Sequence, residues 1–242
     1  MSEPSASLTK RLQWRVEWAA HSTLDALVGL LSVPAAFLIG AAMGGLIWRF
    51  IPQRRRVIIR NLRIALQGET DRDKVEGLAR ECFRRTAAGL VCLASTARLK
   101  PRQMSKVLEV ENPELFEEAI AKGRGVVLLL SHMGNWELLS RLIHFFPAGT
   151  RVGAFYRPLN NPLMDHKVLR RREEDGTRMF SKRDSFHQAS GFLREGGVVG
   201  ILADQRVGRQ GEVVPFFGRL TRSSPLPSLL IRRARSEVLS LS

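Results

Sequence analysis

The chain has 242 residues, of which 44% are hydrophobic and 25% charged. This length and balance predict one main folded domain and exclude wholesale disorder. Lysine and arginine number 38 against 23 acidic residues, which gives a net charge of +15. Such a charge favours nucleic acid, an anionic membrane surface, or acidic ligands and carrier proteins as partners. The two cysteines, Cys82 and Cys92, exclude a disulfide scaffold, and we expect both to be buried, reduced thiols.

The N-terminal part is divided into a polar, interfacial segment, residues 1–23, and an apolar membrane-associating helix, residues 24–50. The run Ala26–Trp48 contains no charged residue, and one helix over it would be long enough to cross ~30 Å of hydrocarbon. A basic cluster follows, and the positive-inside rule would keep it in the cytoplasm: Arg54, Arg55, Arg56, Arg60 and Arg63. The alternatives are a buried core helix or a helix that lies on the membrane surface, which Pro34 and Gly44-Gly45 permit.

Residues 51–242 are expected to form the main domain. Its first part, residues 51–97, has a helical pattern, and Asp71 is a suitable cap for a helix. A second short helix is expected over residues 113–121, with Asn112 as its cap.

From Gly125 onward, strand and helix patterns alternate, which predicts an α/β fold with a largely parallel central sheet covered by helices. Continuous apolar runs such as Gly125–Leu130 are typical of strands buried on both faces. Strands are expected at 125–130, 151–156, 177–180, 197–202 and 213–217. Helices are expected at 136–146, 162–172, 185–194 and 224–235.

The segment Ser131–Glu137 follows the first predicted strand, where ligands bind in open α/β sheets. His132 would leave the strand end, Gly134 permits a tight turn, and Asn135 is a suitable helix cap. The loop could bring His132 within reach of the Glu137 carboxylate, which would make the imidazole a general base toward a hydroxyl that attacks an acyl carbonyl. A structural histidine beside a capping glutamate is the alternative.

Other candidate residues follow the later strands. Arg157 could bind a phosphate bidentately, although a solvated arginine in a turn explains it as well. Asn161 suits a helix cap or a ligand contact, and Asp204 could bind ligand or cap a turn. Pro215–Gly218 could wall an acyl-chain pocket or belong to the core. The predicted substrate-binding set is Gly134, Asn135, Arg157, Asn161, Arg170, Arg171, Asp204 and Gln205. No cofactor and no metal are expected, because the histidines are scattered.

Four segments in order resemble the bacterial lipid A biosynthesis acyltransferases, the lauroyl and myristoyl transferases of the lysophospholipid acyltransferase superfamily. They are His132–Glu137, Tyr156–Asp165, Leu202–Gln205 and Val214–Gly218. The apolar N-terminus and the basic cluster agree with this resemblance, which covers about residues 10–235.

The resemblance implies an enzyme on the cytoplasmic face of the bacterial inner membrane. It would transfer a fatty acyl group from acyl carrier protein, or from acyl-CoA, to a hydroxyl of a lipid A precursor. His132 and Glu137 match the family's His-x4-acid dyad, and Arg157, Arg170 and Arg171 fall where the family keeps basic residues for substrate phosphates. Relatives usually continue past the region that matches 224–235, so we expect the domain to be C-terminally short and its missing part to complete the sheet.

Two alternatives remain open at this point. Phosphatidylinositol mannoside or lysophospholipid acyltransferases share the pattern and would change the acceptor. A non-enzymatic basic module that binds membrane or nucleic acid is the alternative from another class. No nucleic-acid partner is expected, because aromatic residues interleaved with basic ones are not evident.

Overall fold

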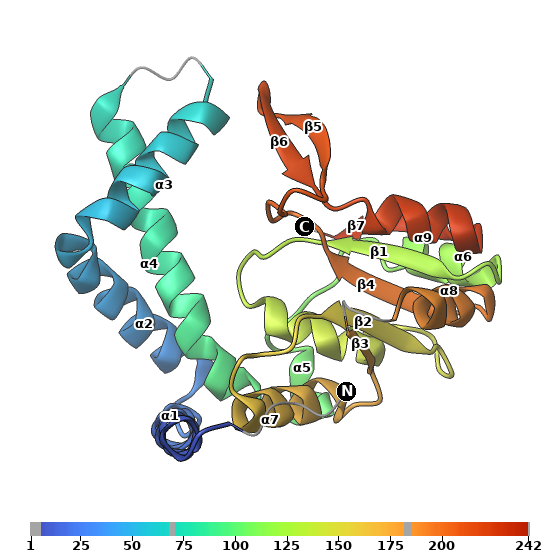
Figure 1. Cartoon of the computed structure of the whole chain (residues 1–242), viewed down its shortest axis with the longest axis horizontal. Helices are drawn as coiled ribbons and strands as arrows, with labels where there is room; N and C mark the ends of the chain where they lie inside the picture. The colour runs from blue at the N-terminus through green and yellow to red at the C-terminus, as the bar shows by residue number, and fades with distance from the viewer. Residues whose placement is uncertain (1–5, 68–70, 182–184, 242) are drawn as a thin grey trace.

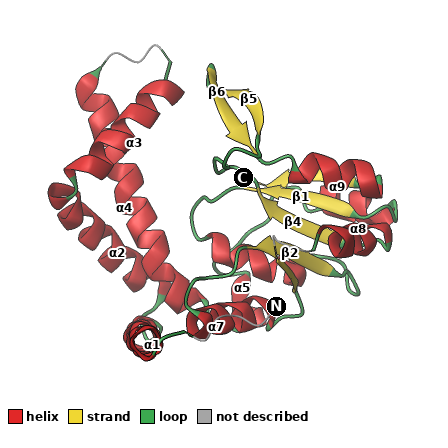
Figure 2. Ribbon diagram, in the orientation of Figure 1, coloured by secondary structure: helices red, strands yellow, loops and turns green. Residues whose placement is uncertain are grey.

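The computed structural model describes residues 6–67, 71–181 and 185–241. In this part of the chain, one sheet contains five parallel strands in the order β3-β2-β4-β1-β7. Figure 2 draws the strands in yellow, with helices beside them. The strands are β1 (Val126–Leu130), β2 (Val152–Tyr156), β3 (Arg178–Ser181), β4 (Val198–Leu202) and β7 (Glu237–Leu241). The predicted α/β class with a largely parallel sheet is therefore confirmed.

Helices cover both faces of the sheet because the central strands alternate two apolar sets of side chains. Val127 of β1 and Val199 of β4 pack against helices α8 (Phe186–Arg194) and α9 (Leu226–Ala234). The neighbouring residues along each strand, such as Leu128 in β1 and Val198 in β4, pack on the opposite face of the sheet. There they meet helix α6 (Glu114–Ala121) and the 3-10 helix η2 (Trp136–Phe145).

The N-terminal helices stand beside the sheet (Figure 1). They are α1 (Leu8–Val28), α2 (Val33–Ile47), η1 (Trp48–Phe50), α3 (Pro52–Ala65) and α4 (Arg72–Thr96), and the short α5 (Pro101–Met104) follows. Asp71 caps α4 as predicted. Of the two cysteines, Cys92 is buried, but Cys82 is exposed on α4 and the prediction for it is wrong.

The predicted single apolar helix over residues 24–50 is interrupted in the structure. Helix α1 runs past residue 23 to Val28, and α2 begins at Val33 after a turn. The break has a local cause, because Pro34 fits only the first turn of a helix, and Ser32 caps α2 through the Ala35 amide. At ~1.5 Å per residue, α2 alone spans ~22 Å, less than the hydrocarbon core.

Helix α2 has one buried side made of small residues and one exposed apolar side. Ala36, Gly40 and Gly44 recur every four residues and face α4. Phe37 and Leu38 are among the exposed large apolar residues. The stretch Val33–Phe50 is long and apolar enough to cross a membrane by length and composition, and 28% of it is buried in the molecule.

Gly40→Ala is expected to destabilise the packing of α2 on α4 by about 1–3 kcal/mol. A Cβ atom at Gly40 would lie 2.6 Å from the Cα atom of Ala88, and this backbone atom cannot move aside cheaply. Gly45→Ala on the same helix is the matched control, since its nearest contact would be the Arg84 side chain at 3.7 Å. Denaturant unfolding of both variants in one detergent buffer checks this prediction. Equal stabilities would contradict the close approach of the helices.

The C-terminal part contains two strands beyond those predicted, β6 and β7. The predicted strand over 213–217 forms β5 (Glu212–Phe216), which pairs with β6 (Arg219–Ser223) in a separate antiparallel hairpin. Phe216 and Phe217 are exposed there, so they do not belong to the core. The segment after Arg235, for which the sequence predicts no element, forms β7, which pairs with β1. Asn112 does not cap α6, which begins after Pro113 without a side-chain cap.

Candidate active site

His132 lies directly after β1, and its carboxylate partner follows the neighbouring strand β4. The ring Nδ1 of His132 lies 2.6 Å from Oδ1 of Asp204. The backbone N–H of His132 donates to Oδ2 of the same carboxylate at 2.8 Å. Because β1 and β4 are adjacent and parallel, their carboxyl ends bring these two residues together.

This contact selects the tautomer of the neutral imidazole. Partial burial acts to raise the pKa of Asp204, but the hydrogen bonds from the ring and backbone of His132 outweigh it, so the pKa of this carboxyl lies below its usual value. The ionised carboxylate can only accept, so Nδ1 of the neutral ring carries the proton. Nε2 is then the unprotonated nitrogen, available as a base.

Glu137 does not pair with His132, and the predicted contact between them is wrong in this structure. Its carboxylate accepts two hydrogen bonds from Arg172 of helix α7 (Pro162–Glu173), at 2.9 Å from Nε and 2.6 Å from Nη2. Helix α7 packs beside η2, and this packing brings Arg172 into hydrogen-bond contact with Glu137. His132, Glu137 and Arg172 nevertheless line the same cavity, whose volume is about 780 Å³.

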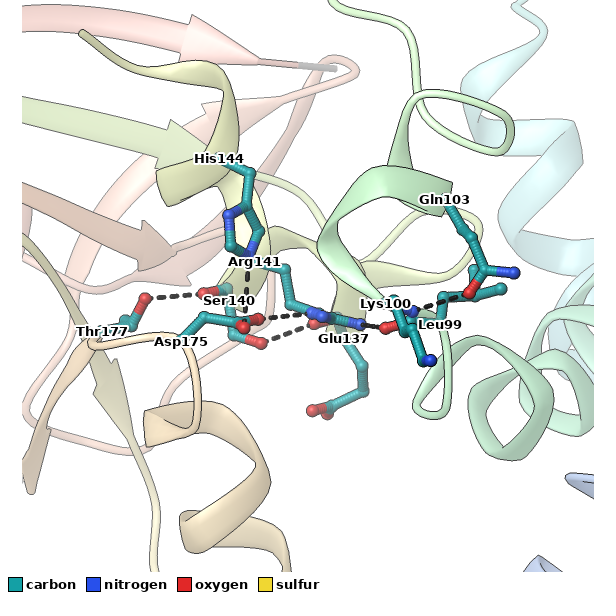
Figure 3. A network of polar contacts seen from close by, with 9 residues as sticks. All are labelled: Leu99, Lys100, Gln103, Glu137, Ser140, Arg141, His144, Asp175 and Thr177. Carbon is teal, nitrogen blue, oxygen red and sulfur yellow. Dashed lines mark hydrogen bonds and ion pairs between the residues drawn. The ribbon is translucent and has the colours of Figure 1, made fainter. Parts of the chain in front are cut away.

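Helix η2, which carries Glu137, is fixed by polar contacts on its other side (Figure 3). Arg141 donates from Nε to Asp175 at 2.5 Å and from Nη1 to the carbonyl of Leu99 at 2.7 Å. The Thr177 hydroxyl donates to the Ser140 carbonyl at 2.6 Å. Ten residues are many for a 3-10 helix, and these contacts hold it. The Glu137 carboxylate points away from them in Figure 3.

Gly134 and Asn135 shape the turn between β1 and η2. Gly134 has a φ of +54°, so the expected tight turn is confirmed. Asn135 does not cap η2 with its side chain, and instead its Nδ2 donates to the Thr96 hydroxyl at 2.7 Å. Its Oδ1 is buried without a hydrogen-bond partner among the residues described here. These contacts tie the turn to the end of α4.

The remaining predicted residues separate into two groups. Arg157 and Gln205 line the cavity of His132. Asn161 is buried, caps α7 through Leu163 and Met164, and donates to Glu17 of α1 at 2.9 Å. Arg171 pairs with Asp25 of α1, while Arg170 is exposed on α7. Asn161 and Arg171 therefore join α1 to α7, and sequence reasoning missed Arg172, the member of the arginine run that reaches Glu137.

Asp25 is expected to make the attachment of α1 dependent on pH. It is almost buried, and its carboxylate pairs with Arg171 and with Lys167 at 3.0 Å. Burial acts to raise its pKa, but the hydrogen bonds from Arg171 and Lys167 bring the pKa below its usual 3.8. The stabilisation is thus present above pH 3.8 and is lost as the pH falls through the lower pKa of the folded state.

Asp25→Asn should therefore cost about 1–2 kcal/mol of unfolding free energy at neutral pH. The difference from wild type should shrink in acid. Chemical unfolding at several pH values measures this, with Glu111→Gln at an exposed position as the control. A difference that does not change with pH would contradict the role of the Asp25 carboxylate.

A second, mostly apolar cavity of about 510 Å³ adjoins the first. Residues of α1, α2 and α4 line it, including Leu24, Met43 and Leu90. Glu137 and Arg172 line both cavities, so the two meet at this ion pair. Within residues 6–67, 71–181 and 185–241, no group of three or more His, Cys, Asp or Glu side chains is arranged to hold a metal ion. The absence of a metal and of a cofactor remains a prediction.

A parallel sheet with a histidine–carboxylate pair at its carboxyl edge, beside an apolar cavity, is typical of an enzyme site that can remove a proton beside an apolar ligand. The family model of the bacterial lipid A biosynthesis acyltransferases matches residues 5–242, and the chain belongs to this family.

Two relatives agree with the family. The chain is 26% identical over 192 residues to the lipid A biosynthesis lauroyltransferase of Escherichia coli K12. The aligned region covers 79% of this chain and 61% of that protein. It is 29% identical over 134 residues to the phosphatidylinositol mannoside acyltransferase of Mycobacterium tuberculosis, which covers 53% of this chain and 41% of that protein. The chain thus spans less than two thirds of each relative.

Proposed function

We propose that this protein transfers a fatty acyl group from acyl carrier protein to a hydroxyl of a lipid A precursor, with His132 as the general base. One observation carries the proposal: Nδ1 of His132 is engaged by Asp204, while His132 lines a cavity at the carboxyl ends of the strands. Acyl-CoA is the alternative donor, since both donors present the same thioester.

In the proposed reaction, Nε2 of His132 takes the proton of the acceptor hydroxyl as its oxygen attacks the thioester carbonyl. A C–O bond forms, the C–S bond breaks, and the proton passes from the imidazolium to the departing thiolate. Asp204 stabilises the imidazolium and keeps the ring in the reactive tautomer. The step needs no serine or cysteine nucleophile.

The cationic groups of the cavity are proposed to bind substrate phosphates. Arg157 is exposed at the cavity lining and is suited to bidentate phosphate contacts. Arg172 is already paired with Glu137, so we assign this pair a positioning role at the junction of the cavities. The resemblance assigns Glu137 to the dyad instead, and substitutions of Asp204 and of Glu137 distinguish the two roles.

The apolar cavity between α1, α2 and α4 is proposed to hold the acyl chain. It opens onto the same ion pair as the cavity of His132, so a chain inside it would place its thioester near the base. Helix α2 lines this cavity with one side and exposes Phe37 and Leu38 on another. These exposed apolar side chains support the association of α2 with a membrane. We place the protein at the cytoplasmic face of the inner membrane.

Phosphatidylinositol mannoside is the second candidate acceptor, favoured by the similarity to the mycobacterial enzyme. Incubation of the purified chain with labelled acyl carrier protein and either acceptor tests both. Label in the lipid A precursor is the expected result. Label in the mannoside alone would correct the acceptor, and thioester turnover without any acylated lipid would contradict the proposed function.

A further inference from the structure

A second polar cavity lies away from the histidine site, between α3, the start of α4 and the turn of the β5–β6 hairpin. Its volume is about 940 Å³. The charged groups in its lining are mostly arginines from three elements: Arg55, Arg56, Arg60, Arg63, Arg72 and Arg219. The acidic residue in the lining is Glu76, and it pairs with Arg55. We call this cavity the arginine groove.

Five of the six arginines have no carboxylate partner among the described residues, the exception being Arg55. Arg56, Arg60 and Arg63 recur at the spacing of one helical face of α3, so the fold directs their positive charges to one place. Like charges that line one groove repel one another, and a bound anion would relieve this repulsion. Guanidinium groups bind phosphate oxygens in pairs, which makes phosphate the matching chemical group.

The surroundings of the arginine groove are apolar and exposed. Phe50, the last residue of η1, is 75% exposed, and Leu220 on the hairpin is 77% exposed. Phe216 is also exposed, and its neighbour Phe217 lines the groove. Arginines flanked by exposed aromatic and aliphatic side chains match a bilayer surface, where phosphates lie above an apolar layer. An acidic protein would pair with the arginines but would leave these apolar side chains exposed to water.

We propose that the arginine groove binds the phosphate head groups of anionic phospholipids in the bilayer. The inference deepens the proposed function and rests on its membrane placement, since it names the surface that would hold the enzyme on the membrane. Helix α2 leads through η1 directly into α3. An apolar contact by α2 and phosphate contacts in the groove would therefore act together.

The test is co-sedimentation with vesicles of phosphatidylglycerol in phosphatidylcholine. A variant with Arg56, Arg60, Arg63 and Arg219 changed to Gln should bind these vesicles at least ~10-fold more weakly. The matched control changes four exposed arginines that lie outside the groove to Gln: Arg102, Arg194, Arg232 and Arg233. It has the same net charge and should bind nearly as wild type. All changed residues are exposed, and equal melting temperatures confirm that both variants are folded.

Two results would overturn the proposal. The first is equal weakening in both variants, which would mean that net charge alone drives binding. The second is unchanged binding of the groove variant to vesicles. If that variant then binds acyl carrier protein more weakly, the groove is a protein-docking site. Acyl transfer in detergent is measured in parallel, so that an inactive chain which still shows groove-dependent vesicle binding would contradict only the proposed function.

Discussion

Replacing His132 with alanine is expected to lower the rate of acyl transfer by at least ~10²-fold, the usual size of a general-base contribution. The substitution removes the Nε2 base and also the ring that Asp204 holds at 2.6 Å. Substrate binding should change little, because the arginines of the cavity remain. The expected signature is therefore a loss in kcat with a nearly constant KM for the acyl donor.

His166→Ala is the matched control for this substitution, since His166 is exposed on α7 and lines neither cavity. It should transfer acyl groups as wild type does. Initial rates with labelled acyl carrier protein and the lipid acceptor measure both variants. Should His132→Ala keep its rate within ~2-fold of wild type, general-base catalysis by this imidazole would be refuted.

The strands of the sheet and the place of the site could be predicted from local sequence. Runs such as Val126–Leu130 and Val198–Leu202 are continuously apolar and of strand length, and both form central strands. Polar residues that follow such runs must gather at one edge of a parallel sheet. For this reason the sequence predicts both His132 and Asp204 as candidate site residues.

The pairing of these candidates could not be predicted, because it depends on strand order. Strand β4 lies between β1 and β2, which brings Asp204 beside a residue 72 positions earlier in the chain. Proximity in sequence favoured Glu137, but the packing of α7 gives that carboxylate to Arg172. Tertiary packing thus determines which carboxylate pairs with His132, and the spacing of residues within the segment 131–137 cannot predict it.

The break between α1 and α2 is different, since its signal was present in the sequence. Ser32 and Pro34 form the start of a helix, with the serine as cap and the proline in the first turn. The strong apolar character of Ala26–Trp48 hides this local signal. Hydropathy reports burial or membrane contact, whereas caps and prolines report helix boundaries, and the two must be read separately.

Asp204→Asn is expected to reduce acyl transfer by about 10²-fold or more, and Glu137→Gln by clearly less. An asparagine at 204 loses the charge that stabilises the imidazolium and can favour the wrong ring tautomer. A glutamine at 137 weakens the pair with Arg172 but leaves the contact of His132 with Asp204 intact. Initial rates of both variants under saturating acyl donor measure the difference, with the exposed Asp73→Asn as the control.

The order of these two effects separates the geometry of this structure from the family's motif. If Glu137 is the working partner of His132, then Glu137→Gln must show the larger loss in kcat, and Asp204→Asn the smaller one. If Asp204 is the partner, Glu137→Gln should mainly raise the KM, because Arg172 loses its fixed position at the junction of the two cavities. A larger kcat loss in Glu137→Gln would contradict the assignment of Asp204 and would require η2 and α7 to rearrange when substrate binds.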